Sequence, residues 1–206
     1  SRRTGRLVLT EALPVAEKFL ARLRGLSEAK QVDPVGSLRR MTETVGDIDI
    51  IAASDEPKKL IETFITTDGV TSILASGDTK AMVVYGGHID LDLEILPLAE
   101  YGSLLQHFSG SKEHNIAMRS LTDDLGLSFS EHGFKVTKPD HPWAKKQIAV
   151  AKKAKRWDAA RNMILCAREE EVYDTIGLTW IPPELRENSG ELAAAQTGKL
   201  PKLVEL

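Results

Sequence analysis

Two short acidic segments constrain this chain more than any other feature. Asp47 and Asp49 flank Ile48 and run straight into the apolar residues 50–53, which is the pattern of a short buried strand. Residues 88–96 alternate strictly between polar and apolar side chains, which predicts a half-buried strand. The polar face of this second strand carries His88, Asp90, Asp92 and Glu94. If the two strands are neighbours, several carboxylates converge on one patch.

Converging carboxylates repel one another, so such a patch requires positive charge. Mg²⁺ suits carboxylates that share it with substrate phosphates. Upstream, Gly36 and Ser37 offer backbone N–H groups and a hydroxyl, and Arg39 and Arg40 add charge suited to phosphate oxygens. Taken singly, these motifs could be an ordinary strand edge and a plain turn. Gly-Ser, then Asp-x-Asp on one strand and Asp on a later strand, resembles the nucleotidyltransferase superfamily, whose chemistry is two-metal phosphoryl transfer.

Composition limits the class of protein. The 206 residues are 42% hydrophobic and 28% charged, which suits one or two globular domains with a real core. No run of residues approaches a membrane span, and the N-terminus does not look like a signal peptide, so we expect a cytoplasmic protein without a membrane partner. The single cysteine, Cys166, excludes an internal disulfide and is expected to be a plain buried thiol.

Positive charge is segregated in one segment of the chain. The formal net charge is −3, yet residues 138–161 carry eight Lys or Arg against two Asp. Helical spacing predicts a helix over residues 145–167 with a basic face. A solvated face is one interpretation, and a contact with the DNA backbone is the other. The second interpretation would use Lys145, Lys152, Lys153 and Arg156.

The remaining pattern predicts an α+β chain. We expect helices over residues 10–26 and 55–65, and strands over 31–35, 47–53, 70–75, 80–85 and 88–96. Thr10 is the expected N-cap of the first helix. Ser111 should cap a later helix that presents Asn115 and Arg119 on one face. Short strands over 127–136, a short helix opened by Glu169 and an extended segment over 181–186 should follow.

Several stretches, taken in chain order, resemble parts of one family. They are residues 36–49, 78–80, 92–97, 108–119, and 181–187 with 200–205. They look like parts of the family X DNA polymerases, bacterial and archaeal branch. In the same order, these parts are the palm motif, the Gly-Glu-Thr-Lys turn (with Asp78 for Glu), the third-carboxylate strand, the nucleotide-binding helix and the stretch that follows this helix. Together the matches run through roughly residues 3–206 in the right order, which is more specific than any single motif.

The resemblance implies a fold and an activity. The fold would be α+β, with a nucleotidyltransferase palm of mixed β-sheet and helices over residues 1–105 and a small, mostly helical thumb over 106–206. The activity would be template-directed addition of deoxynucleotides to a primer 3′-hydroxyl, of the DNA-repair type. Primer-template or gapped DNA and a deoxynucleoside triphosphate would be the partners, and two Mg²⁺ ions the cofactors, with Mn²⁺ as a substitute. We expect a monomer.

The resemblance also implies roles for individual residues. The catalytic, metal-holding carboxylates would be Asp47, Asp49 and Asp92, with Asp92 touching only the ion at the primer hydroxyl. The triphosphate would be bound by Gly36, Ser37, Arg40 and Gly46. The sugar and base of the incoming nucleotide would meet His107 (where the family usually has tyrosine), Phe108, Gly110, Lys112 and Asn115. Arg119 would check the template side of the new pair, and Lys80 would contact a DNA phosphate.

This sequence also departs from the family. Asp90 and Glu94 stand where arginines are common, so two extra acids could strengthen metal binding or misplace Asp92. We also expect that the chain lacks the helix-hairpin-helix region and the phosphoesterase domain that usually flank such a core. The alternatives are another nucleotidyltransferase, acting on a small molecule or an RNA end, and a non-catalytic DNA-binding fragment.

Overall fold

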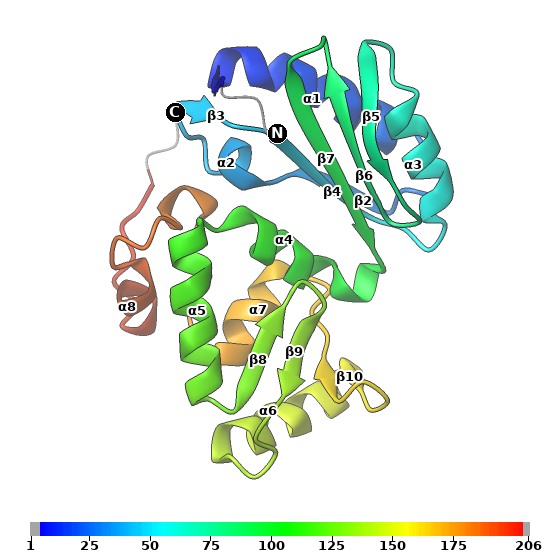
Figure 1. Ribbon diagram of the computed structural model, residues 1–206. Helices are drawn as coiled ribbons and strands as arrows, with labels where there is room; N and C mark the ends of the chain where they lie inside the picture. Colours follow the sequence, from blue (N-terminus) through cyan, green and yellow to red (C-terminus); the bar gives the residue numbers. More distant parts are fainter. Residues whose placement is uncertain (1–4, 204–206) are drawn as a thin grey trace.

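A five-stranded mixed sheet forms the framework of the N-terminal unit, residues 5–100, in a computed structural model that describes residues 5–203 (Figure 1). Its strands are β2 (Gln31–Pro34), β4 (Ile48–Ala53), β5 (Val70–Ser76), β6 (Lys80–Tyr85) and β7 (Ile89–Leu96). The order across the sheet is β2-β4-β7-β6-β5, with β4 and β7 parallel and the other neighbours antiparallel. The two acidic strands are therefore direct neighbours.

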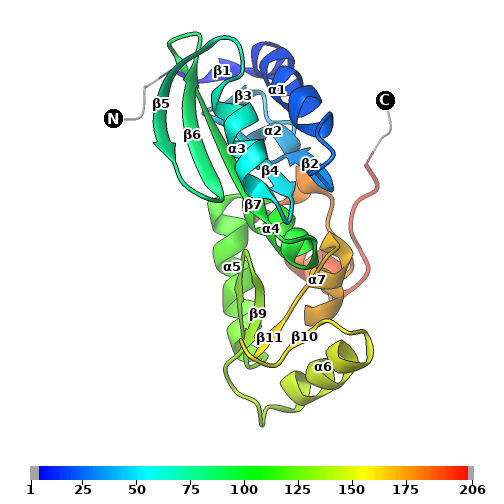
Figure 2. The same ribbon diagram turned by 90° about the vertical axis from the view of Figure 1, so that its right-hand side faces the viewer.

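Two helices, α1 (Leu9–Arg24) and α3 (Pro57–Ile65), cover one face of this sheet (Figures 1 and 2). The Phe19 and Phe64 rings meet with centroids 5.2 Å apart, in a core that takes the apolar side chains of β4 and β7. The prediction of Thr10 as N-cap was wrong. Helix α1 begins at Leu9, directly after β1 (Leu7–Val8). Because β1 pairs with β3 (Thr44–Val45), the backbone just before Leu9 is fixed by strand pairing.

The opposite face of the sheet is covered at one end only. Here η1 (Leu98–Glu100) leads into α4 (Tyr101–Ser109), whose Leu104 packs with Val35 and Ile51. The Tyr101 hydroxyl donates to Asp33 Oδ2 at 2.6 Å. Helix α4 thereby carries the chain from the sheet to the C-terminal unit, residues 110–203, and the rest of this sheet face stays available for the site.

The C-terminal unit is less helical than predicted, since it contains a four-stranded antiparallel sheet as well as helices. Its helices are α5 (Lys112–Asp124), α6 (Pro142–Lys153), α7 (Glu169–Ile176), η2 (Pro183–Leu185) and α8 (Glu191–Gln196). Its strands, in the order β10-β11-β9-β8, are β10 (Trp157–Asp158), β11 (Met163–Ile164), β9 (Gly133–Val136) and β8 (Leu127–Ser130). The predicted cap of α5 is confirmed, because Ser111 Oγ accepts from the His114 N–H at 3.1 Å.

The predicted helix over residues 145–167 is shorter and begins earlier. Helix α6 starts at Pro142, after His141 caps it through Nδ1, and ends at Lys153. Lys155 then takes a left-handed backbone conformation (φ 57°), and residues 157–158 pair with 163–164. Pairing of β11 with β9 supplies sheet hydrogen bonds that a continued helix would forgo, so tertiary context overrides local helix propensity. The segment after α7 was predicted to be extended, but residues 183–185 form the short helix η2.

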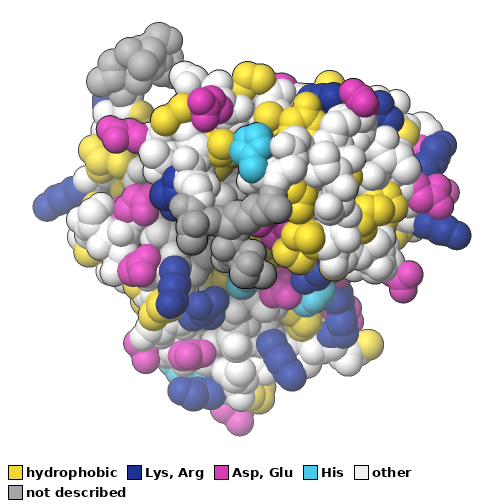
Figure 3. Space-filling model, turned by 45° about the horizontal axis from the view of Figure 1, so that its top comes forward, with side chains coloured by type: hydrophobic (Ala, Val, Ile, Leu, Met, Phe, Trp, Pro, Cys, Tyr) yellow, Lys and Arg dark blue, Asp and Glu magenta, His cyan; other side chains and the backbone are white. Residues whose placement is uncertain are grey.

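Membrane insertion was not expected from the sequence. Within residues 5–203, no helix combines the length and the apolar character needed to cross a bilayer. Basic and acidic side chains are interspersed on the face drawn in Figure 3.

Candidate active site

The register between β4 and β7 brings two of the predicted carboxylates opposite each other. Asp49 lies directly opposite Asp92 in the parallel ladder, and both are half-buried. Both line one pocket of about 290 Å³, and Phe108 of α4 lines it as well. Asp47 stands just before β4 and is also half-buried. We call Asp49, Asp90, Asp92 and Glu94 the carboxylate face of the sheet.

A glycine lets the backbone lie close to the Asp49 carboxylate. Because β2 pairs with β4, the Val35 N–H donates to the Asp49 carbonyl at 2.9 Å, and Gly36 follows at once. Gly36 has φ +62°, and a Cβ built on it would lie 2.5 Å from Asp49 Oδ2. A side chain is therefore excluded both by backbone conformation and by contact. Ser37 lies half-buried in α2 (Gly36–Arg39), a single helical turn where a plain turn was predicted.

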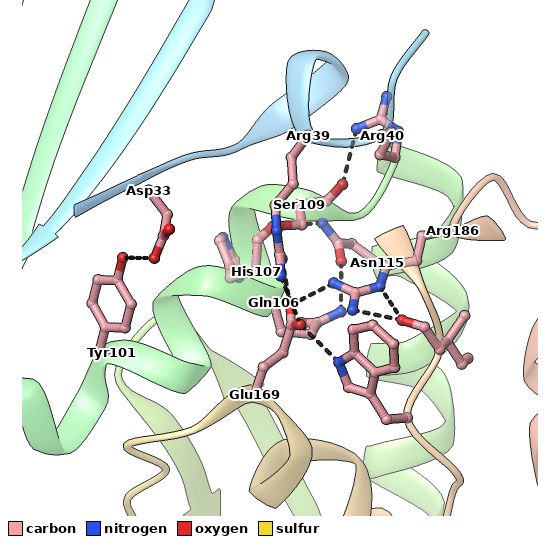
Figure 4. Close-up of polar contacts among 12 residues, drawn as sticks. Asp33, Arg39, Arg40, Tyr101, Gln106, His107, Ser109, Asn115, Glu169 and Arg186 are labelled. Atoms are coloured by element: carbon pink, nitrogen blue, oxygen red, sulfur yellow. Dashed lines mark hydrogen bonds and ion pairs between the residues drawn. The ribbon is translucent and has the colours of Figure 1, made fainter. Parts of the chain in front are cut away.

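The two arginines after Ser37 reach across to the C-terminal unit (Figure 4). Arg40 Nη1 donates to the Ser109 carbonyl at 3.0 Å, and its Nε donates to Glu187 at 2.6 Å. Arg39 Nη1 donates to Ser109 Oγ at 2.6 Å and to Glu169 Oε1 at 2.7 Å. The predicted phosphate ligand Arg40 is thus tied to the end of α4, next to the segment predicted to contact the sugar.

A buried ion cluster lies behind these contacts. Arg186 is fully buried and donates to Glu169 Oε1 at 2.6 Å, and Trp180 Nε1 donates to Glu169 Oε2 at 2.8 Å. Burial alone would raise the pKa of Glu169, but the Arg186 and Arg39 guanidinium groups lower it to about 2. We call Arg39, Glu169 and Arg186 the junction cluster. The sequence held no signal for it, since Arg39 and Glu169 are 130 positions apart.

The segment from α4 to α5 joins three of the predicted nucleotide contacts. Asn115 donates to the His107 carbonyl at 2.7 Å and to the Gly110 carbonyl at 3.3 Å, and a Cβ on Gly110 would lie 2.6 Å from Asn115 Oδ1. The His107 ring lies 5.3 Å from the Phe108 ring, and burial lowers the pKa of His107. Among the described residues, the side chains of Lys112 and Arg119 of α5 form no hydrogen bond or ion pair.

The predicted DNA contacts are dispersed. Lys80 forms an ion pair with Glu94, at 2.8 Å between Nζ and Oε1. Lys145 pairs with Asp140 at 3.1 Å, Lys152 lies over the Trp157 ring, and Lys153 is exposed. Arg156 turns inward and donates to the Leu165 carbonyl. Helix α6 lies at the end of the C-terminal unit that is far from the five-stranded sheet. Strands β9 and β10 lie between α6 and α5 (Figures 1 and 2).

Cys166 is buried, as predicted, and burial raises the pKa of its thiol to about 12. Because the thiolate is the nucleophilic form, this cysteine is suited to packing and not to nucleophilic chemistry.

The donor chemistry at β4 and β7 fits a divalent cation with oxygen ligands. Asp49 and Asp92 lie opposite each other in the ladder, and the Gly36 backbone lies against the Asp49 carboxylate. Within residues 5–203, no three His, Cys, Asp or Glu side chains converge closely enough to form a complete ligand set. The fit therefore rests on the pair of aspartates and the glycine.

Comparison with known proteins adds independent support for the family. A family model described as "DNA polymerase beta thumb" matches residues 104–187. The chain is 30% identical over 183 residues to the DNA polymerase/3′-5′ exonuclease PolX of Bacillus subtilis, an alignment that covers 88% of this chain. It is 25% identical over 171 residues to DNA polymerase lambda of Rattus norvegicus, covering 74% of this chain.

The chain is therefore a relative of the family X DNA polymerases that carries a polymerase beta thumb region. It spans 28% of the length of each of the two relatives.

Proposed function

We propose that this chain is the core of a template-directed DNA polymerase that adds deoxynucleotides to a primer 3′-hydroxyl. The observation that carries the proposal is the parallel pairing of β4 and β7, with Asp49 opposite Asp92 beside Gly36. Its partners would be primer-template or gapped DNA and a deoxynucleoside triphosphate, in line with the name of the Bacillus relative, a DNA polymerase.

Asp47, Asp49 and Asp92 would hold the metal ions. Two bound Mg²⁺ or Mn²⁺ ions would supply Lewis-acid stabilisation of the triphosphate and a lower pKa for the primer hydroxyl. Gly36, Ser37 and Gly46 would hold phosphate oxygens through backbone N–H groups and a hydroxyl. Arg40 would add a guanidinium whose Nε and Nη1 are already oriented by Glu187 and Ser109.

Sugar and base would be held by the segment between α4 and α5. Phe108 lines the same pocket as Asp49 and Asp92, which suits a ring packed against the incoming sugar. Gly110 and Asn115 touch each other, so a base contact by Asn115 would be coupled to the position of this backbone. Arg119, on the same helix face as Asn115, would probe the template side.

Primer extension by the Asp49→Asn and Asp92→Asn variants tests the proposal. Each should lose about 10³-fold in rate. The proposed reason is that the carboxylates hold metal ions, which would stabilise the transition state by several kcal/mol. Asp68→Asn, an exposed partner of Lys18 on the far side of the sheet, is the matched control and should retain full activity. Activity that persists in both site variants would contradict the assignment.

Two further measurements separate the alternatives. Extension of single-stranded DNA or of RNA ends as readily as of a primer-template would favour another nucleotidyltransferase. Nucleotide binding that does not respond to Mn²⁺ or to Asp49→Asn would favour a non-catalytic DNA-binding fragment.

A further inference from the structure

Glu94 is a buried carboxylate on the sheet face that carries the proposed active site. It is 7% exposed, lies two residues after Asp92 and lines the same pocket. A buried charge is costly unless a partner compensates it. Within the described residues that partner is Lys80, whose Nζ lies 2.8 Å from Glu94 Oε1 as an ion pair, without the angles of a hydrogen bond. Lys80 stands directly opposite Glu94 in the antiparallel β6–β7 ladder, so the register of the sheet enforces the pair.

The two partners differ in accessibility. The Lys80 side chain is 61% exposed, whereas that of Glu94 is 9% exposed. An approaching phosphate would meet the ammonium group first, but with the carboxylate charge directly behind it. The pair together presents almost no net charge, so the attraction between Lys80 and a phosphate is much reduced.

We propose that Glu94 is a built-in counter-ion that holds Lys80 in place and lowers the affinity of this sheet face for the DNA backbone. This inference rests on the proposed function, because it assumes that DNA lies along the carboxylate face. Glu94 acts through Lys80 and is therefore a positioning residue. Its role is to set how tightly the bound strand is gripped next to Asp92.

The chain contains a matched pair elsewhere. Lys59 of α3 pairs with Glu28 at 2.6 Å, and the side chains are 56% and 15% exposed, close to the values for Lys80 and Glu94. This second pair belongs to the helix-covered side of the sheet. Glu28→Gln therefore releases a lysine in the same way, but away from the proposed DNA path.

The test is DNA binding by fluorescence anisotropy, with a labelled primer-template at several salt concentrations. EDTA is included, so that changes in metal affinity do not enter. Glu94→Gln should bind several-fold more tightly than the natural chain at low salt. Its plot of log K against log salt should be steeper by about 0.9, which corresponds to one additional phosphate contact. Glu28→Gln should match the natural chain in both respects.

A double variant, Glu94→Gln with Lys80→Gln, separates the role of the lysine from a general loss of negative charge. It should return the affinity and the slope to those of the natural chain or below. Glu94→Gln affinity equal to or weaker than that of the natural chain would overturn the inference. So would an equal gain in the double variant or in Glu28→Gln.

Failure of the inference and failure of the proposed function give different results. If the natural chain binds and extends a primer-template but Glu94→Gln changes nothing, only the counter-ion role is wrong. If the natural chain and the Glu94→Gln variant both fail to bind DNA, both ideas fail together.

Discussion

The junction cluster and the carboxylate face hold charge in opposite ways. In the junction cluster, Glu169 accepts hydrogen bonds from Arg39, Arg186 and Trp180, all supplied by the chain itself. On the carboxylate face, four acids occupy β4 and β7, and the only Lys or Arg in strands β4, β6 and β7 is Lys80. The first group has the hydrogen-bond partners of its carboxylate within the chain. Along its strands, the second carries four acids and one lysine.

The largest effect should come from breaking the junction cluster. Glu169→Ala leaves the Arg39 and Arg186 guanidinium groups without their shared carboxylate, and removal of one partner from a buried ion pair costs about 3–5 kcal/mol. Urea unfolding should show a loss of this size. The neighbouring Glu170 is exposed, so Glu170→Ala should stay within about 0.5 kcal/mol of the natural chain. Equal losses in the two variants would show that the cluster does not stabilise the fold.

Acid should weaken the same cluster. The pKa of Glu169 falls from an ordinary value of 4.5 to about 2 on folding, so its contribution is fully present above pH 4.5 and is lost as pH falls towards 2. The expected loss over this range is about 3 kcal/mol. Glu169→Gln should flatten the dependence of unfolding free energy on pH in this window. An unchanged profile in that variant would assign the acid sensitivity to other carboxylates.

A change beside the carboxylate face should lower activity in addition to any loss of stability. Gly36→Ala forces a Cβ against Asp49 Oδ2, and Gly198→Ala is the matched control, with φ +65° and no atom within 4 Å. Both variants should lose about 1–2 kcal/mol of stability from the left-handed backbone. Only Gly36→Ala should slow primer extension, by about tenfold or more, because small displacements at a reacting centre are costly. Full activity in Gly36→Ala would show that the Asp49 position is not critical.

The smallest effect should come from α6, which belongs to neither group. We still expect this basic segment to contact the DNA backbone. Lys153→Glu should weaken DNA binding and make the plot of log K against log salt shallower by about 0.9, which corresponds to the loss of one phosphate contact. Lys58→Glu on α3 is the matched charge reversal, also exposed. Identical slopes for Lys153→Glu and the natural chain would refute the contact.

Patterns confined to a few neighbouring residues predicted most of the sheet. The strict alternation over residues 88–96 located β7, and the Asp-x-Asp followed by apolar residues located β4. Ser111 was identifiable as a cap because its hydroxyl accepts a hydrogen bond from a backbone N–H only three positions away. These features depend on local chemistry, which a sequence displays directly.

Contacts between distant segments could not be found in this way. Alternation puts Glu94 on the same face as Asp92, but only the β6–β7 register reveals that Lys80 stands opposite it. The junction cluster joins residues 130 positions apart, and no local pattern marks them. The helix predicted to Ala167 failed for a related reason, since pairing of β11 with β9 competes with a sequence rich in Ala and Lys. The catalytic roles of the carboxylates remain predictions.

The parallel ladder between β4 and β7 has a consequence for how the protein folds. Parallel neighbours cannot be joined by a tight hairpin, and here the connection includes α3, β5 and β6. The chain must close this whole crossover before Asp49 and Asp92 can meet, which is a slow, non-local step. A partly folded chain with only hairpins formed would therefore have no carboxylate pair, and catalytic competence would arrive late in folding.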